Sequence, residues 1–249
     1  MCFTVSIYAS THVIETDLGA TFDASETYEP YVHVSGFVFP ALPIVTNSEP
    51  HRIGMAQWGL VPRWVNDTAA ADELRSMTLN ARSETMFEKP AFRDAAVRRR
   101  GLIPVNGFLE WRTEGSVKRP YHIRAVDGSL ITLGVLWDDW LDRNTGEVHR
   151  TFSIATTAAN TLMAWIHNAK QRMPVIVERT ERQTWLFDDD KERLKGILGP
   201  LPDGRLIAEP VSKNVARVKV NRADHNLLEP LAQGIVVPPD EALQGNLGF

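Results

Sequence analysis

The residue with the clearest chemical potential is the only cysteine, Cys2, which follows Met1. Removal of Met1 would leave Cys2 with a free α-amine and a thiol on adjacent carbons. Such a pair captures aldehydes, because the amine forms an imine with the carbonyl and the thiol then closes a thiazolidine ring. The pKa of an α-amine is about 7.7–8.0 and that of a thiol about 8.5, so neighbouring groups must assist at neutral pH. The plain alternative is a buried structural cysteine.

The residues after Cys2 predict a β-strand that would hold this nucleophile in place. Residues 3–8, Phe-Thr-Val-Ser-Ile-Tyr, alternate apolar and polar side chains and are rich in β-branched and aromatic types. This pattern is typical of strands. Chain ends usually fray, so we expect the strand to fix the position of Cys2.

Two groups elsewhere in the chain are candidates for proton transfer. Glu110 stands between Leu109 and Trp111, and burial between bulky neighbours raises the pKa of a carboxyl group towards neutrality, where it both donates and accepts protons. His167 follows a predicted helix and lies close in sequence to Lys170. It is either a proton carrier or an ordinary histidine without a special role.

Two further stretches combine residue types that suit nucleic-acid binding. A polar run at residues 80–85 contains Asn80 and Arg82. A second run, from Trp58 to Trp64, follows a predicted strand and includes a proline and an arginine. We expect Trp58 to lie in the core, which leaves Trp64 as a surface on which a nucleobase can stack.

Composition narrows the class of protein. The 249 residues carry a net charge of −4, with 43% apolar and 23% charged residues, which is ordinary for a soluble globular protein. No apolar run reaches the length of about 18 residues that a membrane span needs, and the N-terminus lacks a signal peptide. One cysteine excludes an internal disulfide and suits a reducing cytoplasm. The histidines lack ligand spacing and the glycines form no phosphate-binding loop, so we expect no metal and no nucleotide.

Positive charge is concentrated in two stretches. Residues 88–119 hold eight basic and four acidic residues, and residues 205–222 hold five and one. These stretches either form a positive concave face or are ordinary solvated surface. The triplet at 98–100 also suits the C-terminal end of a helix, where cations are favourable.

The pattern of elements predicts an α+β fold. Many short apolar segments read as strands, with helices between them and no regular β-α-β alternation, which favours one domain on a mostly antiparallel, barrel-like sheet. We expect a tight turn at 106–107, a helix at 158–166 capped by Thr157, and strands at 175–177 and 215–220. No internal repeat or low-complexity linker occurs.

The motifs, taken in order, resemble the SOS response-associated peptidase (SRAP) family of abasic-site processing proteins. The resemblance covers most of the chain and rests on Met1-Cys2, Trp58-Gly59-Leu60-Val61-Pro62-Arg63-Trp64, Asn80-Ala81-Arg82-Ser83-Glu84-Thr85, Lys89-Pro90-Ala91-Phe92-Arg93, Pro104-Val105-Asn106-Gly107-Phe108-Leu109-Glu110-Trp111, and Ile166-His167 followed by Arg172-Met173-Pro174-Val175-Ile176.

The resemblance implies a monomer with one SRAP domain at residues 1–222 and a partly irregular C-terminal extension at 223–249. It implies a protein of the DNA damage response that binds single-stranded DNA and joins Cys2, after removal of Met1, to the aldehyde of an abasic site. No cofactor is expected. The resemblance also implies cysteine-peptidase-like self-processing and lyase activity. It implies a cytoplasmic location, with the protein at the nucleoid when it is bound to DNA.

The resemblance also assigns roles to individual residues. Cys2 matches the nucleophile, Asn80 the residue that orients it, Glu110 the acid/base, and His167 the histidine beside the lesion. Candidate DNA contacts are Arg82 at a phosphate, Trp64 as part of a wedge that unstacks bases, and the cations Arg63, Lys170 and Arg172.

The sequence departs from the family pattern at three points. Phe3-Thr4 follows Cys2 where Gly-Arg is usual, so a phosphate contact from that arginine is absent. Val65 follows Trp64 where some relatives have a second tryptophan. Five residues separate His167 from Met173, which is more than in the shorter His-Asp-Arg-Met-Pro form.

Two other functions remain open at this stage. The terminal Cys2 could attack amides as a peptidase, with His167 or its own amine as base. A non-catalytic module could bind single strands through Trp64 and the basic stretches, with strong salt dependence.

Overall fold

The computed structural model describes residues 2–24 and 26–231. In chain order, its strands are β1 (Thr4–Ile7), β2 (Thr21–Phe22), β3 (Tyr31–Ser35), β4 (Ala41–Thr46), β5 (Glu49–Trp58), β6 (Asn80–Arg82), β7 (Arg100–Val105), β8 (Gly107–Glu114), β9 (Val117–Ala125), β10 (Ile131–Leu141), β11 (Val148–Ala158), β12 (Arg172–Pro174), β13 (Leu206–Pro210) and β14 (Val220–Asn221). The α-helices are α1 (Thr11–Leu18), α2 (Thr68–Met77), α3 (Arg93–Arg98), α4 (Thr161–Ile166), α5 (Arg182–Phe187) and α6 (Lys191–Ile197), and the 3-10 helices are η1 (Gly36–Val38), η2 (Arg179–Glu181), η3 (Lys213–Ala216) and η4 (His225–Leu228).

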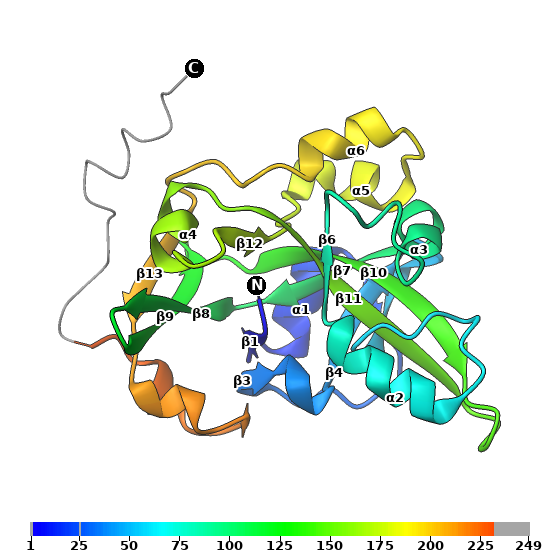
Figure 1. Cartoon of the computed structure of the whole chain (residues 1–249), viewed down its shortest axis with the longest axis horizontal. Coiled ribbons are helices and arrows are strands. Elements are labelled where there is room, and N and C mark those ends of the chain that lie inside the picture. Colours follow the sequence, from blue (N-terminus) through cyan, green and yellow to red (C-terminus); the bar gives the residue numbers. More distant parts are fainter. Residues whose placement is uncertain (1, 25, 232–249) are drawn as a thin grey trace.

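Five strands close into a barrel (Figure 1). Strands β11, β10, β7, β4 and β5 pair in this order, each antiparallel to the next. The ring closes through a parallel pairing between β5 and β11, so the barrel strands do not expose a long open edge. The short strands β6 and β12 extend the far end of β11. The predicted α+β fold with a mostly antiparallel, barrel-like sheet is therefore confirmed.

The second sheet has the strand order β13-β9-β8-β1-β3-β14. The predicted first strand is confirmed as β1, and it lies inside this sheet rather than at its edge. Val5 is opposite Phe108 of β8 on one side and opposite Val34 of β3 on the other. Hydrogen bonding on both sides fixes the start of the chain.

The chain passes from the barrel to the second sheet at Asn106. The sequence predicted a tight turn here, and this prediction is wrong, because Gly107 already belongs to β8, and β7 and β8 lie in different sheets. The Asn106 side chain instead accepts hydrogen bonds from the backbone N–H groups of Tyr8 and Ala9, at 2.7 and 3.0 Å. Asn106 thus fastens the crossing to the end of β1.

Two predicted boundaries near the site also differ from the structure. Helix α4 begins at Thr161 with Asn160 as its N-cap, rather than after Thr157, because β11 continues to Ala158 to pair with β12. The strand expected at 175–177 contributes only an isolated bridge at Ile176, and the regular pairing lies just before it, in β12.

The segment after β13 covers the outer face of the second sheet. The strand expected at 215–220 is not formed: its first two residues belong to η3, residues 217–219 are irregular, and only Val220 lies in a short strand, β14. Val211, Val215 and Leu228 form a second apolar cluster with Val32 and Leu109 of the sheet. The domain boundary expected at residue 222 stays a prediction, and residues 232–249 of the expected extension lie outside the described residues.

Part of the basic stretch 88–119 is structural. Arg100 is almost fully buried, and its guanidinium donates to the backbone carbonyls of Ala96, Val97, Trp185 and Asp188. These carbonyls belong to the ends of α3 and α5, where helices leave acceptors unsatisfied. Arg100 is therefore a cap shared by two helices, as the helix-end alternative for the triplet predicted.

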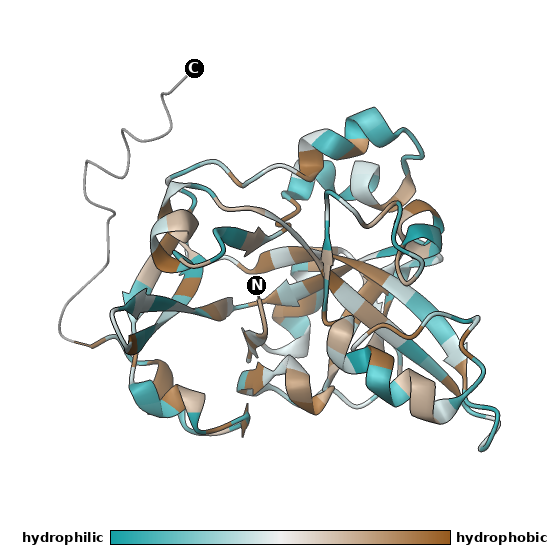
Figure 2. Cartoon of the chain, in the orientation of Figure 1, coloured by the Kyte–Doolittle hydropathy of each residue, from teal (hydrophilic) through white to brown (hydrophobic). Residues whose placement is uncertain are grey.

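Apolar residues concentrate where the layers meet. In Figure 2 much of the brown lies on the central strands, whereas the tips of the β8–β9 and β10–β11 hairpins are teal. Trp58 is fully buried and donates from its indole N–H to the Leu79 carbonyl, which confirms the prediction that it belongs to the core. No helix in the described ranges is long and apolar enough to span a membrane.

Candidate active site

Cys2 lies directly before β1 and is fully buried. Its Sγ atom is 4.0 Å from the Thr4 carbonyl oxygen. Burial raises the pKa of the Cys2 thiol well above its ordinary value, and the Glu110 carboxylate raises it further. The thiol is therefore protonated at neutral pH, and Glu110 lies within electrostatic range of it.

Asn80 contacts the Cys2 residue directly. Its amide nitrogen Nδ2 donates to the Cys2 carbonyl oxygen at 2.9 Å. β6 brings it there by pairing in parallel with β11, with Asn80 opposite Ile154. The other side-chain atom, Oδ1, is buried without a hydrogen-bond partner among the described residues, so it is placed to accept from an added N–H group.

Glu110 extends from β8, the strand that pairs with β1. The alternation of a strand puts its side chain on the same face as Phe108, which belongs to the main core. Only 4% of Glu110 is exposed, and this burial raises the pKa of its carboxyl group to about 7. Both protonation states are therefore populated at neutral pH, as acid–base catalysis requires.

His167 is the C-cap of α4, and it also closes the turn that leads into β12. Its Nδ1 lies 3.0 Å from the Arg172 carbonyl oxygen and 3.3 Å from the Arg172 backbone nitrogen. The shorter contact is satisfied when Nδ1–H donates to the carbonyl, which leaves the lone pair on Nε2. Burial lowers the pKa of His167. The imidazole is therefore mostly neutral at physiological pH.

The segment that carries His167 is docked on the same strand as Glu110. Arg112 lies over the Trp165 ring, with its guanidinium carbon 4.0 Å from the ring centroid, and donates to the Trp165 carbonyl. Asn168 and Thr113 exchange two hydrogen bonds, of 2.8 and 3.1 Å. Strand β8 thus positions the carboxyl group and also anchors the helix end that holds the histidine.

Comparison with known proteins supports one family for this arrangement. The profile of the family described as SOS response associated peptidase (SRAP) matches residues 1–218. This chain belongs to the SRAP family.

Several named relatives are similar to it. The abasic site processing protein YoaM of Bacillus subtilis is 31% identical over 90% of this chain and 96% of its own length. The abasic site processing protein HMCES of Xenopus tropicalis is 29% identical over 56% of this chain and 46% of its own length. A crystal structure of a Bacteroides thetaiotaomicron protein is 34% identical, with a TM-score of 0.86 over 92% of this chain and 100% of that chain.

In this SRAP protein the expected DNA contacts have different environments. Arg82 and Lys170 are exposed. Arg172 instead forms a two-bond ion pair with Glu84 and donates to the Thr156 carbonyl at 2.7 Å, and its side chain is only 12% exposed. Arg172, which lies in β12, thus connects this strand with the loop that follows β6, on the other side of β11. A role for these three cations at DNA stays a prediction.

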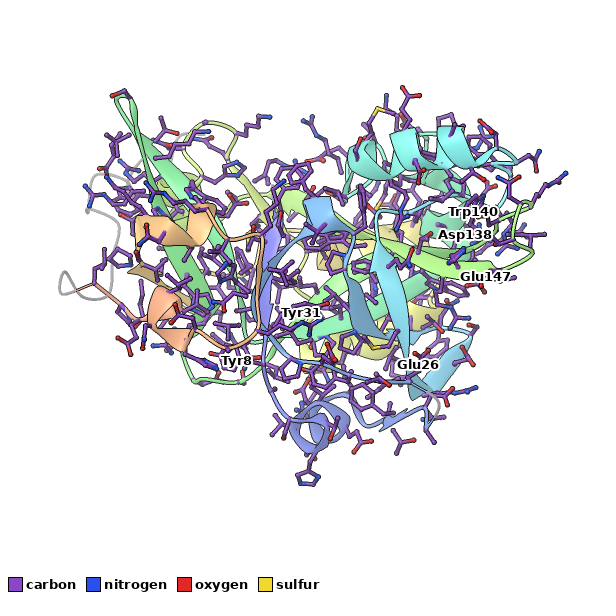
Figure 3. The ribbon with its side chains drawn as sticks, turned by 90° about the horizontal axis from the view of Figure 1, so that it is seen from below. Tyr8, Glu26, Tyr31, Asp138, Trp140 and Glu147 are labelled. Carbon is purple, nitrogen blue, oxygen red and sulfur yellow. The ribbon has the colours of Figure 1, made fainter. Side chains whose placement is uncertain are left out.

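The loop that carries Trp64 is held by hydrogen bonds to residues of β10. The Arg63 backbone N–H donates to Asp138 at 3.1 Å, and the Trp140 indole donates to the Val65 carbonyl at 2.8 Å. Figure 3 places Asp138 and Trp140 close together beneath α2. Because the residues on both sides of Trp64 are held by β10, Trp64 itself faces outward and is 53% exposed.

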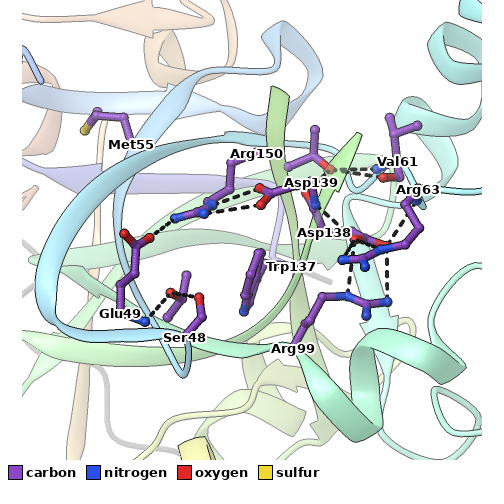
Figure 4. A network of polar contacts seen from close by, with 12 residues as sticks. Ser48, Glu49, Met55, Val61, Arg63, Arg99, Trp137, Asp138, Asp139 and Arg150 are labelled. Atoms are coloured by element: carbon purple, nitrogen blue, oxygen red, sulfur yellow. Dashed lines mark hydrogen bonds and ion pairs between the residues drawn. The ribbon is translucent and has the colours of Figure 1, made fainter. Parts of the chain in front are cut away.

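Asp138 supports the loop that carries Trp64, and the sequence did not reveal it. It is 2% exposed, and the guanidinium groups of Arg63 and Arg99 converge on it (Figure 4), with contacts of 2.8 to 3.2 Å. Arg63 therefore supports the loop, and its contact with DNA stays a prediction. Glu84 was also missed as the partner of Arg172, although it belongs to the polar run 80–85.

Proposed function

We propose that this SRAP protein processes abasic sites by covalent capture, through Cys2, whose α-amine is freed by removal of Met1. The substrate is single-stranded DNA in which the abasic deoxyribose opens to an aldehyde at C1′. The names of the relatives support abasic DNA as the substrate. The arrangement of Asn80 and Glu110 around Cys2 supports the chemistry.

The reaction balances with the groups present. The α-amine of Cys2 attacks C1′, and a proton moves from nitrogen to the former carbonyl oxygen, which gives a carbinolamine. Protonated Glu110 donates a proton to this hydroxyl, which leaves as water, so that an N-protonated imine and the Glu110 carboxylate form. The thiol proton then passes to the Glu110 carboxylate, sulfur bonds to C1′, and the electron pair of the C=N bond moves to nitrogen and neutralises it. The product is a thiazolidine, one water is released, and Glu110 is protonated again.

The remaining residues hold or move protons around these steps. Oδ1 of Asn80 accepts an N–H of the attacking amine, which directs the nitrogen lone pair towards C1′. His167 is mostly neutral, so its Nε2 can take the proton of the sugar hydroxyl while the ring opens. We assign phosphate contacts to the exposed cations Arg82 and Lys170, and the separation of stacked bases to the exposed Trp64.

One observation carries the proposal: the Asn80 amide donates to the Cys2 backbone carbonyl, while Glu110, whose pKa burial raises to about 7, lies within electrostatic range of the Cys2 thiol. The raised pKa of the Cys2 thiol does not favour a peptidase, because an amide-attacking cysteine needs a lowered pKa. Addition to an imine suits a thiol that gives up its proton only at that step.

The test is an intact-mass measurement after incubation with an abasic single-stranded oligonucleotide. We expect an adduct with the mass of the Met1-free protein plus the DNA, less one water. Cys2→Ala should give no adduct, and Glu110→Gln and His167→Ala should form it more slowly while binding DNA with similar affinity.

DNA treated with borohydride, which removes the aldehyde, serves as the matched control and should give no adduct with the wild-type protein. An adduct with Cys2→Ala at the wild-type rate would refute the thiazolidine. Repeated peptide cleavage that depends on Cys2 and ignores abasic DNA would instead support the peptidase.

A further inference from the structure

An aromatic pair stands directly beside Cys2. The rings of Phe3 and Phe37 have centroids 5.0 Å apart and an angle of 35° between their planes. Phe3 is partly buried against the main core. Phe37 is 49% exposed, so the pair is anchored on one side and open to solvent on the other.

The exposed ring is held on a rigid turn. The Gly36 N–H donates to the Phe3 carbonyl at 2.8 Å, and the Phe39 N–H donates to the Gly36 carbonyl at 2.9 Å, which closes η1. Gly36 also packs against the buried Trp58, where a Cβ atom would lie 3.0 Å from the indole ring. A large apolar side chain fixed in solvent costs hydrophobic free energy, and such residues mark binding surfaces when they gather in a patch.

A basic segment runs alongside the strand that leads to this pair. The Ser35 N–H, one residue before η1, donates to the Lys219 carbonyl at 2.8 Å, which brings the segment before β14 alongside. Lys213, Arg217 and Lys219 are exposed, and within the described part of the chain none of them forms an ion pair. An exposed ring beside unpaired cations is the combination that binds single-stranded nucleic acid, with bases on rings and phosphates on cations.

We propose that Phe3 and Phe37 form a stacking platform for the nucleobase adjacent to the abasic nucleotide, with Arg217 and Lys219 contacting the phosphates of the same strand. The proposal rests on the proposed function, because it needs single-stranded DNA at Cys2. It explains the departure at Phe3-Thr4: where the family usually has an arginine, this chain holds the strand by stacking.

The test uses oligonucleotides with a tetrahydrofuran abasic analogue, which binds without reacting. One has ordinary bases on both sides of the analogue, and two others replace the base on one side or the other by a second analogue. Dissociation constants are measured by fluorescence anisotropy. We expect Phe37→Ala to weaken binding of the first oligonucleotide about 5- to 150-fold, the range for one lost stacking contact, and to leave binding unchanged where the stacked base is already missing.

Two variants separate stacking from folding. Phe37→Trp keeps an aromatic face and should retain wild-type affinity, whereas Phe37→Leu keeps apolar bulk and should behave like Phe37→Ala. Phe187, 45% exposed at the end of α5, provides a matched control, and Phe187→Ala should change nothing. Lys219→Gln should lower the slope of log affinity against log salt by roughly one phosphate contact.

An equal loss for all three oligonucleotides with Phe37→Ala would overturn the platform, as would no loss for any of them. The second result would point to a protein rather than a base as the occupant. The outcome is separate from that of the covalent mechanism, because the analogue cannot crosslink: Cys2→Ala can refute the thiazolidine while base-dependent binding through Phe37 still holds.

Discussion

Glu110→Gln provides the sharpest test of the candidate site, because one substitution should change stability and chemistry in opposite directions. The amide has nearly the same shape as the protonated carboxyl group, but it neither ionises nor transfers a proton. The variant should therefore lose the acid–base function while it relieves the folded protein of a buried charge.

The magnitude follows from the burial of Glu110, which raises the pKa of its carboxyl group from an ordinary 4.5 to about 7. Between these values the folded state holds a proton that the unfolded chain has released. The stability that this group contributes is thus complete below pH 4.5 and is lost as pH rises to about 7. One pKa unit corresponds to about 1.4 kcal/mol, so the total loss is about 3 kcal/mol.

The assay is urea unfolding of the wild type and Glu110→Gln at pH 4.5, 6, 7 and 8, with circular dichroism as the signal. The advantage of the variant in free energy of unfolding should grow by about 3 kcal/mol across this range and should level off above pH 7. Taking the difference cancels the other titratable groups, which both proteins share.

A difference that stays constant with pH would refute the reasoning, because it would mean that Glu110 titrates alike in the folded and unfolded states. The same samples, incubated with abasic DNA at pH 7, report the chemical effect. A variant that gains stability and still crosslinks at the wild-type rate would remove Glu110 from the mechanism.

Three more predictions concern the framework of the site. Burial lowers the pKa of His122 from 6.5 to about 4. The stability that the neutral form contributes is therefore present above pH 6.5, and about 3 kcal/mol of it is lost as pH falls to 4. In thermal melts, His122→Gln should lack this loss, and a pH profile identical to that of the wild type would contradict the prediction. Gly107→Ala would put a Cβ atom 2.5 Å from His122 Nε2 and closer still to the Ile123 carbonyl, and we expect urea unfolding to show a loss of about 1–3 kcal/mol, whereas an unchanged midpoint would exclude the clash. Arg100→Met removes the donors to two helix ends and should lower the free energy of unfolding by about 3 kcal/mol or more, so a melting temperature equal to the wild type would count against the shared cap.

Features that depend on neighbouring residues were predictable from the sequence. The alternation after Cys2 predicted β1. The contrast between a buried Trp58 and an exposed Trp64 also held. In each case the signal lies within one element, where hydrophobic pattern and backbone preference act together.

Features that depend on distant pairing were not predictable from local pattern. Nothing near Asn80 indicates that β6 will pair with β11, more than 70 residues later, and only the family resemblance placed Asn80 at Cys2. For Arg100 the local pattern predicted a cation at a helix end, but not that the end of α5, more than 80 residues later, would supply its other acceptors. Asn106-Gly107 has the composition of a hairpin turn, yet the chain changes sheets there because β1 occupies the place beside β8.

The interior position of β1 sets an order of events during synthesis. The chain start emerges from the ribosome first, but its partners β3 and β8 follow only about 30 and 100 residues later. If Met1 is removed by an enzyme, removal is possible in that interval, while residues 4–7 are not yet paired with β3 and β8. A copy that folds before it is trimmed would have a fully buried Cys2 without a free α-amine.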